Sequence, residues 1–460
     1  LGLRLDSAAG LSYHGPAVCH PVCFDPDRQA KGDTVTATIL VMLLVLLAIL
    51  GAPLFTILLA VAMVGFYSQG IDLSVVAIEI YRIADMPLLL ALPFFAFAGY
   101  VVGHSRTSER LVRLTQVFLG WMPGGLAIVS LVACALFTAF TGASGVTIVA
   151  LGALLYPALM QDGYRERFSL GLVTSSGSLG LLFPPSVPLI LYGVVAQQMG
   201  VGRVFTIEDL FWAGLLPGLL MLVLLAGWSL WTNRRMARQR QSFSISEALA
   251  AVRAAIWEIP LPIFLIVGIY SGYLAISEAA VMTAAYVVVV EVFIYREIPI
   301  KQLPAIMRES MVMVGGILLI LGVSLAFTNY LIDAEVPMRL FNLIQRLVSD
   351  KIVFLVLLNL LLLMLGAILD IFSALVIMVP LILPVAVSYG VDPVHMGIIF
   401  LANMQIGYFT PPVGMNLFIA SFRFEKPVAE LYRATIPFMI VLLVAVLVIT
   451  YLPQLSLFFQ

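Results

Sequence analysis

Long apolar runs recur along almost the whole chain and are separated by short polar stretches. Most of these runs reach the roughly 20 residues that a helix needs to cross the hydrocarbon core of a bilayer. Some are shorter, and two long ones, Leu170–Val195 and His395–Phe422, are interrupted by proline pairs. The pattern predicts an all-α polytopic membrane protein in which some helices do not cross the membrane completely.

Basic residues indicate the orientation, because loops on the cytoplasmic side retain lysine and arginine. Four basic clusters occur, at residues 106–113, 234–240, 296–308 and 423–433. The stretch Asp72–Asp85 is acidic on balance and should lie outside. Two stretches of the chain begin and end on the same side of the membrane by this assignment, so the short apolar runs within them need not cross it. This predicts two re-entrant helical hairpins. The runs within Leu126–Leu159 should enter from the cytoplasm and return, and Ile352–Val387 should enter from the opposite face.

Two distant segments share one spacing of proline and glycine. In each, a proline is followed after six residues by a glycine and, 21 residues after that glycine, by a proline pair. The positions are Pro157, Gly163, Pro184 and Pro185 in the first segment, and Pro384, Gly390, Pro411 and Pro412 in the second. With hairpins entering from opposite faces, this spacing indicates an inverted repeat with a binding site near the middle of the membrane.

Each proline pair should break its helix, because proline donates no backbone hydrogen bond and does not fit a regular helical turn. The carbonyls expected to lose their partners are those of Gly180, Leu181, Gly407 and Tyr408. Unpaired backbone groups at membrane depth are tolerated only inside protein or along a cavity. Carbonyl oxygens suit a small hard cation, and the half-helix after each break points its positive end at the break, where a carboxylate would be stabilised.

Hydroxyl, amide and small residues gather around the expected hairpin turns and breaks. For a single serine, close helix packing is the simpler interpretation. For the clusters at both breaks we favour binding. The candidate substrate and ion site comprises Thr141, Gly142, Ala143, Ser144, Gly145, Ser175, Ser176, Gly177, Ser178, Gly180, Pro184, Pro185, Asp370, Ser373, Asn403, Gly407, Thr410, Pro411, Pro412 and Asn416.

Charged residues in the apolar segments are few. Glu278 and Asp370 are costly there unless they are paired or hydrated, so each is a functional candidate. For Glu278 the favoured interpretation is a carboxylate that complements the dipole at a helix N-terminus. For Asp370 both interpretations stay open.

The first thirty-three residues differ from the rest. His14, Cys19, His20 and Cys23 are residue types that bind metals, but their spacing fits no standard zinc pattern. We expect a poorly ordered leader at residues 1–33 rather than a metal site.

Composition narrows the function. Apolar residues make up 62% of the chain and charged residues 11%, against about 25% charged in soluble domains. No basic stripe suggests nucleic acid. No HExxH or GxSxG motif supports an enzyme, and no GxxxxGK[ST] loop supports ATP-driven pumping. We therefore expect transport driven by an ion gradient and no cofactor. Inverted hairpins favour alternating access over a channel.

At these residues the chain resembles the large membrane subunit of TRAP transporters, the tripartite ATP-independent periplasmic systems. The stretches that carry the resemblance are residues 137–147, 183–193, 277–280 and 391–417. The resemblance implies an inverted-repeat elevator-type transporter of the bacterial inner membrane. It implies two partners, a small four-helix membrane subunit and a periplasmic substrate-binding protein. The implied substrate is an organic anion, such as a C4-dicarboxylate or another organic acid, and sodium is the implied coupling ion.

The resemblance also assigns residues and domains. The implied sodium ligands are Thr141, Ser144, Gly180, Ser373, Asn403 and Gly407. The first hairpin reads Thr141-Gly-Ala-Ser-Gly145 where the family usually has Ser-Gly-Ser-Ser, so backbone carbonyls should supply more of the coordination there. The expected domains are scaffold helices with a cytoplasmic arm at 34–122, transport subdomains at 123–200 and 336–422, and scaffold helices at 201–335 and 423–460. The alternative is a stand-alone sodium/anion symporter of the related two-hairpin type.

Overall fold

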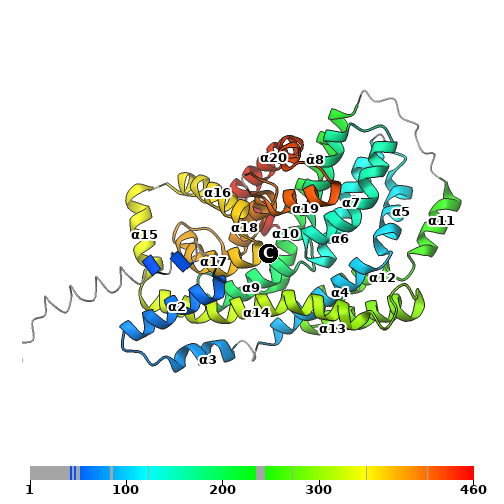
Figure 1. The fold of residues 1–460 in the computed structure, drawn as a ribbon. Coiled ribbons are helices and arrows are strands. Elements are labelled where there is room, and N and C mark those ends of the chain that lie inside the picture. The colour runs from blue at the N-terminus through cyan, green and yellow to red at the C-terminus, as the bar shows by residue number, and fades with distance from the viewer. Residues whose placement is uncertain are drawn as a thin grey trace, which may run out of the picture. The chain divides into compact units, whose positions relative to one another are not determined.

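The structure is a computed structural model that describes residues 42, 43, 46, 47, 52–82, 86–122, 124–234, 244–271, 273–348, 350–411 and 413–459. Residues 54–460 form one compact unit, and the account below concerns that unit (Figure 1). The described residues form helices and no strand. Seven of these helices are long and apolar enough to cross a membrane. The prediction of an all-α polytopic protein is confirmed, whereas the expected leader lies outside the described residues.

The same order of elements occurs twice along the chain. A helix and a more polar helix are followed by a hairpin, a broken helix and a long apolar helix. The first set is α4 (Ala91–His104), α5 (Thr107–Leu119), α6 (Gly125–Thr141), α7 (Ser144–Gln161), α8 (Glu166–Ser176), α9 (Val187–Met199) and α10 (Ile207–Thr232). The second set is α14 (Leu303–Asp333), α15 (Val336–Leu347), α16 (Lys351–Ile368), α17 (Ile371–Ser388), α18 (Pro393–Gly407), α19 (Met415–Phe424) and α20 (Val428–Tyr451). The repeat expected from the proline spacing is therefore present as a repeat of elements.

The remaining elements flank or connect these sets. They are α2 (Leu54–Ser68), α3 (Ser74–Arg82), the 3₁₀ turns η2 (Pro87–Leu90) and η3 (Leu179–Leu182), α11 (Ile245–Ala254), α12 (Pro260–Tyr270), α13 (Ile276–Val288), the π-helical turn η4 (Val289–Ile294) and α21 (Gln454–Leu457). Helices α2, α3 and α4 pack on α14, and α4 also packs on α13. Glu278 is exposed and accepts a hydrogen bond from the Ala275 N–H at 3.0 Å, at the start of α13. The interpretation of Glu278 as a helix N-terminal carboxylate is confirmed.

Both helical hairpins are formed by two helices joined through two residues. Gly142 and Ala143 connect α6 to α7, and Leu369 and Asp370 connect α16 to α17. Gly142 has a φ of 64°, in the left-handed region that glycine adopts without strain, and its N–H donates to the Thr138 carbonyl at 2.8 Å. The turns that the sequence predicts are thus the hairpin tips.

Both broken helices are interrupted near their proline pairs. The first runs through α8 and η3 and bends by 43° before α9 begins at Val187. The second ends at Gly407 and resumes at Met415. The two repeats interlock across these breaks, because α9 packs on α17 and α19 packs on α7. Each hairpin therefore contacts the second half of the other repeat's broken helix.

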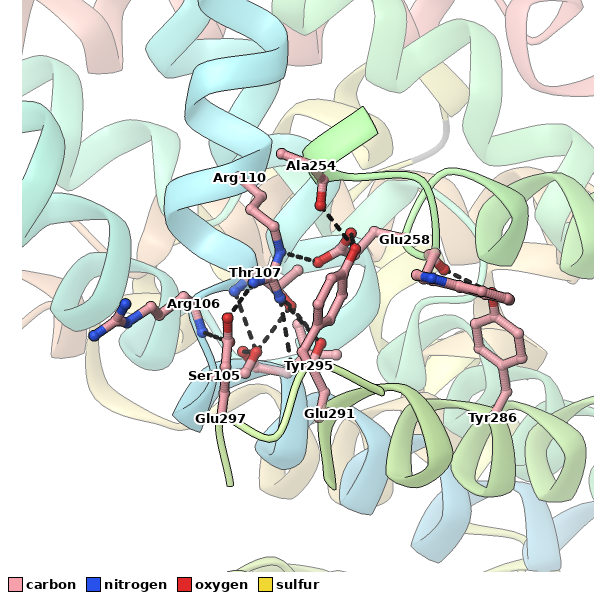
Figure 2. A network of polar contacts seen from close by, with 12 residues as sticks. Ser105, Arg106, Thr107, Arg110, Ala254, Glu258, Tyr286, Glu291, Tyr295 and Glu297 are labelled. Carbon is pink, nitrogen blue, oxygen red and sulfur yellow. Dashed lines mark hydrogen bonds and ion pairs between the residues drawn. The ribbon is translucent and has the colours of Figure 1, made fainter. Parts of the chain in front are cut away.

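A compact ionic cluster joins the start of α5 to the segments around α11, α12 and α13 (Figure 2). The guanidinium of Arg110 forms ion pairs with Glu258, Glu291 and Glu297. Its Cζ atom also lies 4.0 Å from the ring centroid of Tyr295, a cation–π distance. Burial lowers the pKa of Arg110, but hydrogen bonding to Glu297 and the charges of Glu258 and Glu291 outweigh it and raise that pKa. Arg110 therefore stays charged at any physiological pH.

Candidate functional site

The tip of the first hairpin lies between the two helix breaks. The buried Ser144 hydroxyl donates to Asn416 Oδ1 at 2.8 Å, which connects α7 to α19 across 272 residues of sequence. A Cβ atom at Gly142 would lie 3.0 Å from Val187 Cγ2, at the start of α9. A Cβ atom at Gly145 would lie 2.7 Å from Ile419 Cδ1 on α19. The structure thus brings candidate residues from both repeats together at this tip.

The rest of the first tip is held by its own backbone and by neighbouring threonines. Thr141 is buried, and its hydroxyl lies 3.5 Å from the Ala143 carbonyl. The Ala143 carbonyl also accepts from the Thr147 N–H at 3.3 Å. Thr138 Oγ1 donates to the Gly177 carbonyl at 2.9 Å and lies 2.7 Å from Thr147 Oγ1. Sequence reasoning missed Thr138, whose hydroxyl joins the hairpin to the first broken helix.

The serines of the first broken helix divide into two groups. Ser175 and Ser176 donate to carbonyls one turn back in α8, those of Gly171 and Val173, so their hydroxyls are satisfied within their own helix. Ser178 instead donates to the Gln405 carbonyl on α18 at 3.0 Å. The sequence predicts a binding role for all three serines, whereas only Ser178 connects the two broken helices.

Gly180 and Gly407 allow close contact between backbones. A Cβ atom at Gly180 would lie 2.3 Å from the Ala135 carbonyl oxygen on α6. A Cβ atom at Gly407 would lie 2.5 Å from the Gly366 Cα on α16. No side chain fits at these distances, so each glycine lets a broken helix approach its own hairpin.

The prediction of stranded carbonyls is wrong for three of the four residues. The Gly180 carbonyl accepts from the Phe183 N–H at 3.0 Å. The Gly407 carbonyl accepts from the Thr410 N–H at 3.0 Å, and the Tyr408 carbonyl accepts from the Asn416 N–H at 2.9 Å. Tight turns replace the lost helical bonds at Gly180 and Gly407, and the start of α19 supplies the donor for Tyr408. Each carbonyl oxygen has a second lone pair, so one accepted bond leaves it able to coordinate a cation.

The second hairpin tip is fastened to the second break. Gly414 donates its N–H to the Ala367 carbonyl at 2.9 Å, and the Ile371 N–H donates to the Tyr408 hydroxyl at 2.6 Å. Asp370 accepts from the N–H of Ser373 at 3.0 Å and so caps the N-terminus of α17. This capping role gives the Asp370 carboxylate a structural function.

The remaining candidates lie in the two breaks. Pro184 and Pro185 lie in the first break, between η3 and α9. The Thr410 hydroxyl, just after α18, donates to the Ile406 carbonyl at 2.8 Å, and Pro411 is exposed. Pro412 lies outside the described residues.

Asn403 is the candidate that the structure connects most widely. It is fully buried, and its Nδ2 donates to Asn359 Oδ1 at 2.6 Å and to the Ile399 carbonyl at 2.8 Å. Asn359, on α16, also accepts from the Thr450 hydroxyl on α20 at 3.1 Å. Sequence reasoning missed Asn359, although it is the single amide within the apolar stretch Ile352–Ile368 and could have been found as such.

Buried polar atoms without a partner are concentrated on the two broken helices. Six of the eight such side-chain atoms in the described residues lie there, on Thr174, Ser186, Asn403, Gln405 and Asn416. The Gln405 amide has neither a donor nor an acceptor partner although it is fully buried. An unsatisfied buried polar group costs about 1–3 kcal/mol, so a group of them needs an explanation. Sequence reasoning missed Ser186 and Gln405.

Comparison with known proteins identifies the family. The model described as "Tripartite ATP-independent periplasmic transporter, DctM component" matches residues 40–455. The chain belongs to this family. Its members are transporter permeases, and the chain is a multi-pass protein of the inner membrane, in keeping with its spanning helices.

Curated relatives of this TRAP permease differ in the substrate that their names give. The C4-dicarboxylate TRAP transporter large permease protein DctM of Rhodobacter capsulatus is 32% identical over 92% of this chain and 98% of its own length. The ectoine/5-hydroxyectoine large permease UehC of Ruegeria pomeroyi is 30% identical over 92% of this chain and 98% of its own length. The isethionate permease DctMQ of Oleidesulfovibrio alaskensis is 32% identical over 90% of this chain, which spans 65% of that protein.

A solved structure shares the fold. The YdaH transporter of Alcanivorax borkumensis, described as having an unusual topology, superimposes with a TM-score of 0.59 over 82% of this chain and 87% of its own. The two sequences are 16% identical, so the likeness concerns the fold alone.

Proposed function

We propose that this TRAP large permease imports an organic anion together with sodium, through the site at the two helix breaks. The observation that carries the proposal is the concentration of unpartnered, fully buried polar atoms on α8, α18 and α19 and in the first break. A bound cation or carboxylate would give these atoms partners.

Sodium is the proposed coupling ion because the site offers neutral oxygen donors. The Asn403 Oδ1 atom has no partner, and the carbonyls of Gly180 and Gly407 each keep a free lone pair. Hard oxygen ligands suit small hard cations. In the described residues no group of three or more His, Cys, Asp and Glu side chains is placed to hold a metal ion, so a cation bound at the breaks would rely on these neutral oxygens.

The organic anion is proposed to bind at the same tips. Helices α9 and α19 start at the breaks, so their N–H groups and positive dipole ends point toward a bound carboxylate. The names of the relatives include C4-dicarboxylates and isethionate, which fits an organic acid as the substrate class. We propose delivery by a periplasmic binding protein and a complex with a small membrane subunit, as the tripartite family implies.

An elevator movement is proposed for the hairpins and broken helices against α4 and α14. At one contact, a Cβ atom at Gly99 on α4 would lie 2.7 Å from the Thr141 Cα at the hairpin tip. At another, the Ser324 hydroxyl on α14 donates to the Val376 carbonyl on α17 at 2.9 Å. Contacts through small residues and single hydrogen bonds let packed surfaces slide.

Uptake by proteoliposomes tests the proposed function. The vesicles contain this chain with its small subunit and are supplied with the binding protein and a radiolabelled C4-dicarboxylate, isethionate or ectoine. Uptake is measured with an inward sodium gradient and without a gradient. We expect uptake of one of these substrates only with the gradient and the binding protein. Equal uptake with potassium in place of sodium would overturn the coupling. Uptake by this chain alone would support the stand-alone symporter instead.

A further inference from the structure

An apolar cavity lies beside the ionic cluster. Its volume is about 260 Å³, and its walls come from α5, α6, α12 and α13 with η4. Leu136, Phe140, Ile263 and Val287 are among its lining residues. A cavity of about 150 Å³ already holds benzene, so this one has room for a segment of hydrocarbon chain. The half-exposed Leu136 shows that the wall is open to the surroundings of the protein.

One end of the cavity is acidic. Glu258 and Glu291 both line it, and both belong to the ionic cluster (Figure 2). The cluster contains three carboxylates and one guanidinium. Arg106 contributes only its backbone N–H, which donates to Glu297 at 2.7 Å, while its side chain points away from the cluster (Figure 2). Among its described residues the cluster therefore has three acidic side chains that share one basic side chain.

The occupant of such a cavity must be apolar along its length and cationic at one end. Each carboxylate has about four acceptor positions, so Glu258 and Glu291 can accept further bonds besides those from Arg110, Tyr295 and Thr107. A bare metal ion would leave the apolar walls without a matching partner.

We propose that this cavity binds a phospholipid whose headgroup carries a primary ammonium. The ammonium pairs with Glu258 and Glu291, and part of an acyl chain lies between α6 and α12. A primary ammonium donates three hydrogen bonds to carboxylates, whereas the quaternary ammonium of choline donates none. Because α6 belongs to the first hairpin, the lipid fills the space between this hairpin and α12. The proposal is independent of sodium coupling and of the transported substrate.

Lipid binding to the purified full-length chain tests the proposal. After delipidation, phosphatidylethanolamine or phosphatidylcholine with identical acyl chains is added back, and retained lipid is measured by native mass spectrometry together with the melting temperature. We expect a single tightly retained phosphatidylethanolamine and about tenfold weaker binding of phosphatidylcholine, the factor expected for a charge-assisted hydrogen bond.

Two pairs of variants locate the site. Glu258→Gln should lose the preference for phosphatidylethanolamine, whereas Glu297→Gln, which removes the same charge from the cluster but does not line the cavity, should keep it. Leu136→Trp should fill the cavity and release both lipids. The matched change Val149→Trp, at a similarly exposed residue of α7, should not.

Three outcomes would overturn the proposal. The first is equal retention of the two lipids by the unmodified chain, and the second is an equal loss of the preference for phosphatidylethanolamine in Glu258→Gln and Glu297→Gln. The third is displacement of the lipid when the small subunit is added, which would make that subunit the occupant. If Glu258→Gln fails to fold, the pair Leu136→Trp and Val149→Trp still decides the question.

Discussion

At the scale of single residues, the site depends on side chains that connect different helices. Ser144 bonds to Asn416, Ser178 to the Gln405 carbonyl, and Asn403 to Asn359, each on another helix. Ser175 and Ser176 have equally polar side chains but are satisfied within α8. A hydroxyl group in a broken helix is therefore a strong candidate for binding only where it faces out of its own helix.

Asn403→Ala should weaken the sodium dependence of uptake more than it lowers the stability of the fold. The change removes the unpartnered Oδ1 atom that we propose as a sodium ligand, so the sodium concentration for half-maximal uptake should rise about tenfold. Ser176→Ala is the matched control and should leave that concentration unchanged. Unaltered sodium dependence in Asn403→Ala, with normal expression, would remove Asn403 from the sodium site.

Gly142→Ala should destabilise the first hairpin tip. A φ of 64° costs a residue with a Cβ atom about 1–2 kcal/mol, and the new methyl group would press on Val187. The melting temperature should fall. Gly315→Ala, in α14 with nothing near its Cβ position, should instead raise it slightly, because alanine favours helices by about 1 kcal/mol over glycine. Equal melting temperatures for the two variants would contradict this account.

At the scale of elements, the ionic cluster fixes the start of α5 to three segments that are distant in sequence. Arg110 and the carboxylates that it contacts are mostly buried, with 12% of the Arg110 side chain and 2% of the Glu291 side chain exposed. A buried charge destabilises the protein strongly once its partner is removed, so the loss of one member should weaken the whole cluster.

Arg110→Gln should destabilise the protein by about 3–5 kcal/mol, because it leaves three carboxylates without their common cation. Arg113→Gln, on the same helix but exposed, should change stability by less than about 0.5 kcal/mol. Melting curves of the purified variants measure both changes. Rescue of Arg110→Gln by Glu258→Gln would show that unpaired charge is the cause, and a mild effect of Arg110→Gln would show that the cluster does not hold α5.

At the scale of the whole molecule, the two repeats interlock so that each hairpin contacts the other repeat's broken helix. We propose that the hairpins and broken helices, joined in this way, move as one body. Its contact with α4 passes through Gly99, where the Thr141 backbone leaves no room for a side chain.

Gly99→Leu should slow transport at least about tenfold, because the added side chain meets the hairpin tip in the state described here. Sodium binding, measured by calorimetry on the purified chain, should change much less. Gly227→Leu, where nothing lies near the Cβ position, is the control and should transport normally. Loss of binding and transport to the same extent would indicate misfolding rather than blocked movement.

The sequence by itself determined the class of protein, the two hairpins and the two broken helices. Apolar run length and the paired prolines act locally, because two consecutive residues without a backbone donor disrupt a helix. A single proline does less, since α10 continues through Pro217 and α20 through Pro437. The exposed cap at Glu278 and the hairpin tip at Gly142 also follow from local backbone preferences.

Only the tertiary structure decided which polar groups meet. The pairs Ser144–Asn416 and Asn403–Asn359 depend on helices that are far apart in the chain. A spacing pattern shows that a helix breaks, but the direction of a side chain depends on how the broken ends pack. The same holds for the ionic cluster and its cavity, whose members come from four separate segments.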